Sequence, residues 1–245
     1  MTSFFYSRLS SFYFSYYFFV GLFVPYWGIY LTSLSFSALQ IGALLSLFQI
    51  SRIFAPNFLG WIADRSGEYI KWIKISSFFG FILFIGIFWA NSFLSIFLIM
   101  MAMSIFTSST LPLAESLTLA HLKANKADSK YSHIRLWGSI GFIVAAILLG
   151  IMIDSIGEKS LIYALLLTQL VIFLLAFILP TKKVIFLPKK KRSIWPILKK
   201  REVVVLLLSC ALMVSSHGLL YNFYSIFLEH QGYSGTTIGL LWAVG

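Results

Sequence analysis

The stretch Arg135-Leu136-Trp137-Gly138-Ser139-Ile140-Gly141-Phe142 carries a guanidinium into the start of an apolar segment that contains no further charge up to residue 153. A charged side chain near the middle of a bilayer costs roughly 2.5–3.5 kcal/mol on insertion scales, so it is expected to face a cavity or a partner. The nearest candidate partner is Glu115, in the preceding apolar segment, and the loop between the two segments turns the chain back. The sequence therefore predicts that Glu115 and Arg135 meet across two neighbouring antiparallel helices.

Small residues follow this arginine at spacings that favour close helix contact. They are Gly138, Ser139, Gly141, Ala145 and Gly150. Because small side chains let helix backbones approach closely in lipid, we expect this helix to pack tightly against its neighbours.

Composition indicates a polytopic membrane protein. The chain is 59% hydrophobic and only 11% charged, with a mean hydropathy of +0.89. A soluble protein would have nowhere to bury that much apolar surface. The single cysteine, Cys210, excludes a disulfide framework or a cysteine metal site, and the sequence indicates no cofactor or metal.

The distribution of basic residues along the chain, rather than the net charge of +11, indicates whether the chain faces a membrane or a nucleic acid. Most Lys and Arg residues lie in the N-terminal stub or in the second, fourth and sixth connections between apolar segments. This positive-inside pattern predicts a cytoplasmic N-terminus, a lipid bilayer as the surroundings and no nucleic-acid partner. We expect a bacterial cytoplasmic (inner) membrane.

Six apolar segments precede Thr181. They span residues 12–31, 39–62, 72–89, 93–119, 134–153 and 161–180. A basic stretch at 181–202 separates them from a seventh segment at 203–228 and the first residues of an eighth. The predicted fold is all-α, with a six-helix bundle at 1–180, a basic cytoplasmic linker at 181–202 and the start of a second bundle at 203–245.

Polar residues interrupt the second segment on one helical face. Gln49, Arg52 and Pro56 recur at helical spacing, which suggests a face turned toward a water-filled cavity. The alternative is a structural polar contact between helices. Arg52 lies about 20 Å into the membrane at 1.5 Å per residue, and Asp64 on the same helix is out of reach at about 18 Å.

Two guanidiniums facing one carboxylate would leave a positive cavity, and an anion would balance it. We therefore predict a substrate that carries a carboxylate, gripped by Arg52, with Tyr26, Tyr30 and Tyr221 lining its apolar part. Alternatively, Arg52 bonds backbone carbonyls freed by Pro56 or an acid elsewhere. A neutral sugar or nucleoside would then be the better substrate.

Three aromatic or ionisable positions have two interpretations each. Tyr26 and Tyr30 lie one turn apart near the outer end of the first segment, where an interfacial aromatic belt is an equal explanation. His217 shares a face with Tyr221 and is a candidate for protonation, because imidazole changes charge near physiological pH. A hydrogen-bonded packing role for His217 is the alternative.

An internal repeat connects the beginning and the end of the chain. Phe36-Ser37, Ile41-Gly42 and Leu44 reappear in the same order and spacing as Tyr233-Ser234, Ile238-Gly239 and Leu241. Parallel repeats of this kind build transporters from two related halves.

The stretch Gly60-Trp61-Ile62-Ala63-Asp64-Arg65-Ser66-Gly67-Glu68 resembles the G-x-L-A-D-R-x-G-R-K signature of major facilitator superfamily transporters. Gly60, Asp64, Arg65 and Gly67 match it, whereas Glu68 and Tyr69 replace basic residues. The resemblance implies a major facilitator fold in which these four residues belong to a cytoplasmic gate.

The resemblance narrows further in three places. Residues 134–142 resemble the start of the fifth helix in the proton-coupled lactose and nucleoside permeases. The stretch 111–116, the His217 and Tyr221 pair, and residues 232–242 resemble phenylpropionate-type permeases. The resemblance implies that Arg135 contacts substrate and that Glu115 is its acidic partner in proton coupling. No proline follows Gly138 in that helix, so the antiporter signature is absent and symport is favoured.

The sequence thus predicts a proton-coupled symporter of a small organic solute, in which Glu115 or His217 takes up the proton. An aromatic acid such as a phenylpropionate is favoured over a sugar or nucleoside. A membrane enzyme is disfavoured because His121, His133, His217 and His230 have no metal-like spacing. Besides a transporter and a membrane enzyme, a third possible class of protein is a non-transporting fragment. A carrier of this type needs a C-terminal bundle, so we expect residues 1–245 alone to insert without coupled transport.

Overall fold

The computed structural model describes residues 3–180 and 195–244, and this part of the chain is helical with no strands. The first group of helices is α1 (Ser3–Ser33), α2 (Ala38–Ser66), α3 (Tyr69–Ile85), α4 (Phe93–Ala124), α5 (Tyr131–Ile156) and α6 (Ser160–Ile178). Short 3-10 turns, η1 (Gly86–Trp89) and η2 (Asp128–Lys130), follow α3 and precede α5. The second group is α7 (Trp195–Leu198), α8 (Arg201–His230) and α9 (Gly235–Val244). The predicted all-α fold is confirmed.

Seven of the described helices, α1 to α6 and α8, are long and apolar enough to cross a membrane. Several of them extend beyond the predicted segments. α1 begins at Ser3 rather than at residue 12, and α4 continues to Ala124. Hydropathy detects only the part of a helix that lies in lipid, whereas the backbone continues to hydrogen-bond outside it. Of the predicted linker, residues 181–194 lie outside the described residues, and its last part is helical in α7 and at the start of α8.

Local signals set the helix ends. The Ser37 side chain accepts a hydrogen bond from the Gln40 N–H, and the Gln40 side chain bonds back to the Ser37 N–H, which forms a capping box at the start of α2. Gly67 ends α2 in the left-handed region at φ 69°, and its N–H bonds Ala63 O at 2.9 Å. A glycine is required there because other L-residues adopt this conformation at a cost.

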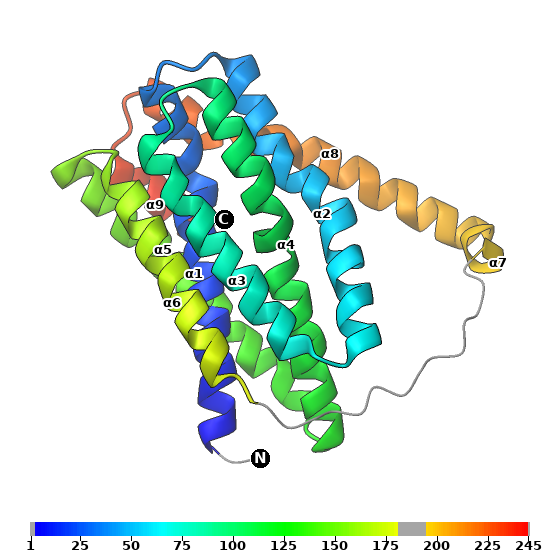
Figure 1. The fold of residues 1–245 in the computed structure, drawn as a ribbon. Helices are drawn as coiled ribbons and strands as arrows, with labels where there is room; N and C mark the ends of the chain where they lie inside the picture. The colour runs from blue at the N-terminus through cyan, green and yellow to red at the C-terminus, as the bar shows by residue number, and fades with distance from the viewer. Residues whose placement is uncertain (1–2, 181–194, 245) are drawn as a thin grey trace.

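α1 is the central helix of the fold, and it packs most extensively against α5 (Figure 1). Its side chains Phe12, Tyr13, Tyr26 and Trp27 are fully buried. Phe23 stacks on Trp27 with ring centroids 5.2 Å apart. α3 lies between α4 and α6, and α2 packs on α4, where the Ser51 and Ser104 hydroxyls hydrogen-bond. The core is therefore built around an aromatic first helix.

The glycines of α5 are contact points with other helices, as predicted from their spacing. A Cβ on Gly138 would lie 2.5 Å from the Tyr17 ring, and a Cβ on Gly141 would overlap the Phe14 carbonyl of α1. A Cβ on Gly150 would overlap the Gly235 carbonyl at the start of α9. One helix face thus packs backbone to backbone against both α1 and α9.

The second group of helices meets the first at one end only. The upper end of the bundle in Figure 1 holds the α1–α2 and α5–α6 turns and the start of α9. There α8 packs on α1 through Ile226 against Gly28, and Ser225 and Leu228 are buried. The first half of α8 is exposed along its length and lies away from the bundle (Figure 1). The second group therefore rests on the first through the contacts of α8 with α1 and of α9 with α5.

Candidate functional site

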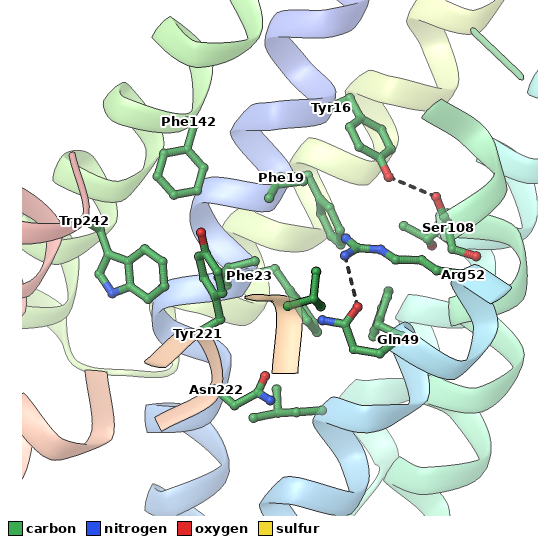
Figure 2. A pocket seen from close by; sticks show the side chains of 16 residues that line it. Tyr16, Phe19, Phe23, Gln49, Arg52, Ser108, Phe142, Tyr221, Asn222 and Trp242 are labelled. Carbon is green, nitrogen blue, oxygen red and sulfur yellow. Dashed lines mark hydrogen bonds between the residues drawn. The ribbon is translucent and has the colours of Figure 1, made fainter. Parts of the chain in front are cut away.

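A cavity of about 370 Å³ lies where the two groups of helices face each other (Figure 2). The lining residues come from α1, α2, α4, α5, α8 and α9. They are Tyr16, Phe19, Val20, Phe23, Val24, Leu45, Phe48, Gln49, Arg52, Thr107, Ser108, Phe142, Val214, Tyr221, Asn222 and Trp242. Its volume falls within the range of about 300–1,000 Å³ that is usual for small-molecule sites.

Arg52 supplies the charge of this cavity. Its Nη1 donates to Gln49 Oε1 at 3.3 Å, one turn earlier on α2 (Figure 2). Two ion pairs occur among the described residues, and neither includes Arg52. The cavity therefore presents a guanidinium that donates its hydrogen bond to a neutral amide.

Aromatic rings form the walls around this charge. Phe19 and Phe23 of α1 line one side, and the Tyr221 and Trp242 rings lie 5.9 Å apart on the other. Polar groups are fewer: Tyr16 donates its hydroxyl to Thr107 O at 3.2 Å, and Asn222 of α8 also faces the cavity. The combination of one cation, a few hydrogen-bonding groups and aromatic surface suits a small aromatic anion.

Glu115 and Arg135 meet across α4 and α5. Arg135 Nη1 lies 3.0 Å from Glu115 Oε1, and the two side chains are 51% and 27% exposed. The pair does not line the cavity. Glu115 lies seven residues beyond Ser108 on α4, about 10 Å along the helix axis. The expectation that both arginines share one positive cavity is therefore corrected: Arg52 lies in the cavity and Arg135 lies in a separate cluster.

The predicted tyrosines have different surroundings. Tyr221 lines the cavity, but Tyr26 and Tyr30 do not. Tyr26 is fully buried and donates to Ala146 O at 2.6 Å and Gly235 O at 3.1 Å, joining α1, α5 and α9. Tyr30 is buried with its ring 5.2 Å from that of Trp27. Both are corrected from cavity lining to helix packing, because they lie two turns further along α1 than Phe19 and Phe23, where their side chains are buried.

His217 is exposed on α8 and does not line the cavity. Its Nδ1 lies 2.8 Å from Met213 O on the same helix, and its ring stacks on Tyr221 at 6.0 Å. The hydrogen bond and the ring contact are both made within α8, and a role in proton coupling stays a prediction.

The residues of the predicted gate motif are at the end of α2. Asp64 accepts a hydrogen bond from the Tyr69 hydroxyl at the start of α3, and the Arg65 guanidinium lies over the Trp61 ring at 5.5 Å. Gly67 supplies the left-handed cap, whereas a Cβ on Gly60 would meet no atom within 4 Å. Gly60 is thus not required by packing within the described chain.

The sequence did not point to two polar residues, Tyr131 and Asp154, that bond other helices or the ion pair of Glu115 and Arg135. Tyr131 bonds both members of the Glu115 and Arg135 pair, and its position four residues before Arg135 was an available signal. Asp154 accepts hydrogen bonds from α9, which no spacing in the sequence indicates. Across the described residues, no three His, Cys, Asp or Glu side chains gather in a way that could hold a metal ion.

A model of the MFS_1 like family matches residues 6–245. The chain belongs to this family. It is 27% identical to the probable 3-phenylpropionic acid transporter of Escherichia coli (strain K12), over 95% of this chain and 62% of that protein. It is also 30% identical to the maltose permease of Geobacillus stearothermophilus, over 69% of this chain and 43% of that protein.

A solved structure shows the same fold. The crystal structure of a mutant of the nucleoside transporter NupG superposes with a TM-score of 0.80 at 21% identity, over 91% of this chain and 58% of that one. The chain thus spans about three fifths of the relatives that it matches along nearly its whole length. The resemblance to major facilitator transporters is confirmed, and the chain is an integral membrane protein.

Proposed function

We propose that this chain takes part in proton-coupled symport of a small organic solute, with an aromatic carboxylic acid such as a phenylpropionate as the favoured substrate. One observation carries the proposal: Arg52 lies in an aromatic-walled cavity and in neither of the two ion pairs of the described chain. An uncompensated guanidinium in a membrane is costly, so a bound anion would stabilise it.

The cavity has a binding group for the carboxylate of such a ligand and an aromatic surface for its aryl group. A guanidinium binds a carboxylate through two parallel N–H donors, which fixes the orientation of the acid. An aryl group would then lie among Phe19, Phe23 and Trp242. The similarity to a probable 3-phenylpropionic acid transporter supports the same substrate class.

Proton coupling is assigned to the ion pair of Glu115 and Arg135, with His217 as a second candidate. A physical connection runs from the cavity to this pair. Tyr16 lines the cavity, its ring lies 5.9 Å from that of Tyr17, and Tyr17 packs on Gly138, three residues after Arg135. A shift of α1 on substrate binding would reach Arg135 and release Glu115 to accept a proton.

Alternating access is proposed to move the two groups of helices relative to each other. In this proposal residues 1–180 and 203–245 are the two moving parts and residues 181–202 join them. The cavity has lining residues from both parts. In this proposal the N-terminus is cytoplasmic in a bacterial inner membrane. Gly60, Asp64, Arg65 and Gly67 then belong to the cytoplasmic gate.

The test is ligand binding to the purified chain in detergent, measured by isothermal titration calorimetry. We expect binding of 3-phenylpropionate, and a loss of about 10- to 100-fold in affinity for Arg52→Gln, the usual range for a charged hydrogen bond. The matched control is Lys71→Gln, which removes an exposed cation that pairs with Glu68 outside the cavity, and it should leave affinity unchanged. Equal affinity in Arg52→Gln would contradict the assignment.

A neutral nucleoside is the second candidate. The cavity offers sugar hydroxyls the polar side chains of Gln49, Ser108 and Asn222, and a nucleoside transporter has the same fold. Uridine and maltose are therefore titrated alongside the acid. If uridine bound and 3-phenylpropionate gave no heat of binding, the proposed substrate would be a neutral solute instead of an aromatic acid.

A further inference from the structure

Tyr131 is the first residue of α5, one helical turn before Arg135. Three polar groups meet at its hydroxyl. Arg135 Nη1 donates to the Tyr131 oxygen at 3.2 Å and to Glu115 Oε1 at 3.0 Å, and the Tyr131 O–H donates to the same carboxylate oxygen at 3.4 Å. The ion pair is thus a three-membered cluster.

A phenol suits a carboxyl group that gains and loses a proton. Toward an ionised carboxylate the hydroxyl acts as a donor, and toward a carboxylic acid its lone pairs act as an acceptor. A phenylalanine would offer neither. In either protonation state, Tyr131 can therefore keep Glu115 hydrogen-bonded when Arg135 withdraws.

Other titratable groups are within electrostatic reach of Glu115 but bond elsewhere. Tyr13 and Tyr16 of α1 donate to Thr118 Oγ1 at 3.4 Å and to Thr107 O at 3.2 Å. Tyr17 of α1 also interacts electrostatically with Glu115 and with both Arg135 and Arg52. Among these tyrosines, Tyr131 is the one with a hydrogen bond to the carboxylate.

We propose that Tyr131 is a positioning residue for proton coupling, which holds the Glu115 carboxylate while Arg135 changes partner. The inference rests on the proposed function. It assigns no proton transfer to the phenol itself: the proton moves between water and Glu115, and Tyr131 only changes from donor to acceptor.

The test is the pH profile of 3-phenylpropionate binding by the purified chain, titrated from about pH 5 to pH 9. Two buffers of different ionisation enthalpy give the number of protons exchanged on binding. Tyr131→Phe removes a hydrogen bond that is stronger to the ionised carboxylate than to the carboxylic acid. The midpoint of its pH profile should therefore move to more alkaline pH by about 0.5 to 1 unit. Affinity on the plateau should stay within about twofold, since Tyr131 lies outside the cavity.

Two variants make this result specific. Tyr163→Phe carries the same change on an exposed residue of α6 and should leave the midpoint in place. In a Glu115→Gln background, Tyr131→Phe should produce no further shift. A midpoint for Tyr131→Phe equal to that of the unmodified chain, or a shift that persists in Glu115→Gln, would overturn the positioning role.

Failure of the proposed function has a different signature. If the unmodified chain bound 3-phenylpropionate with no proton exchanged at any pH, proton coupling and the role of Tyr131 would both be wrong. If the unmodified chain exchanged a proton and Tyr131→Phe behaved identically, only the role of Tyr131 would be wrong.

Discussion

The starts of α2 and α9 are the two copies of the sequence repeat, and they share a local cap. At α2, Ser37 Oγ accepts from the Gln40 N–H at 3.3 Å. At α9, Ser234 Oγ accepts from the Thr237 N–H at 3.2 Å. A serine before the first turn satisfies a backbone donor that the helix cannot, which explains why both copies begin at the same place.

The surroundings of the two starts differ. Asp154 of α5 accepts from the Gly235 and Thr236 N–H groups of α9, at 2.7 and 2.8 Å. A Cβ on Gly239 would overlap the Ala146 carbonyl oxygen, whereas one on Gly42 would meet only Phe223 Cζ at 3.6 Å. α9 therefore lies backbone to backbone on α5, whereas Gly42 at the start of α2 has room for a side chain.

The two helix starts show which features depend on local sequence and which depend on the helix packed against them. The serine caps follow from sequence alone. The need for a glycine depends on the helix that packs against it, so the same Gly→Ala change should have opposite signs at the two positions.

The largest effect is expected for Gly239→Ala. The added methyl group meets backbone atoms of α5 that cannot move independently, and overpacking of this kind costs about 1–3 kcal/mol. Thermal unfolding of the detergent-purified protein should show a lower midpoint. Binding of 3-phenylpropionate should weaken as well, because Trp242 lies one turn further along α9.

Gly218→Ala on α8 is the control for this change. A Cβ there would meet no atom within 4 Å, so neither stability nor binding should fall. An unchanged midpoint for Gly239→Ala would mean that α9 does not rest on α5 as described.

Asp154→Ala should have a smaller effect. It removes the acceptors for two backbone N–H groups and for Thr236 Oγ1, at 2.6 Å, so α9 loses a cap supplied by another helix. Loss of a helix cap costs about 0.5–2 kcal/mol, and the exposure of Asp154 places the expectation at the lower end. The measurement is again the thermal midpoint.

Asp154→Asn keeps one acceptor oxygen, so its thermal midpoint should lie between those of the unmodified protein and Asp154→Ala. Glu158→Ala, four residues later in the α5–α6 connection, tests whether the loss of a nearby negative charge is enough to destabilise the protein. If Glu158→Ala destabilised the protein as much as Asp154→Ala, the hydrogen bonds would not be the cause.

Sequence reasoning located what depends on local pattern. The apolar segments, the small-residue face of α5 and the contact between Glu115 and Arg135 follow from hydropathy, spacing and a short connecting loop. Asp154 and Tyr26 could not be assigned, since their partners on α9 are distant in sequence and nothing in the pattern connects them. The ends of several helices were also predicted too short, because hydropathy does not detect turns outside the lipid.

The cavity was predicted only in part for the same reason. Gln49 and Arg52 were found from a polar face on one helix. Asn222 and Trp242 come from helices that the sequence cannot orient, so their contribution required the tertiary arrangement. Tyr16 lies in an aromatic run in which every position looks alike, and only its burial against Thr107 sets it apart.

Gly42→Ala is the smallest change and should have the opposite sign to Gly239→Ala. Glycine inside a helix is less favourable than alanine by about 0.5–1 kcal/mol, because its unfolded backbone has more freedom to lose. The new methyl group would stand at ordinary van der Waals distance from Phe223, so no clash offsets this gain. For a chain of this length, the thermal midpoint should rise by about 1–4 °C. A fall as large as that of Gly239→Ala would show that the start of α2 is as tightly enclosed as that of α9, and the contrast between the two copies of the repeat would no longer hold.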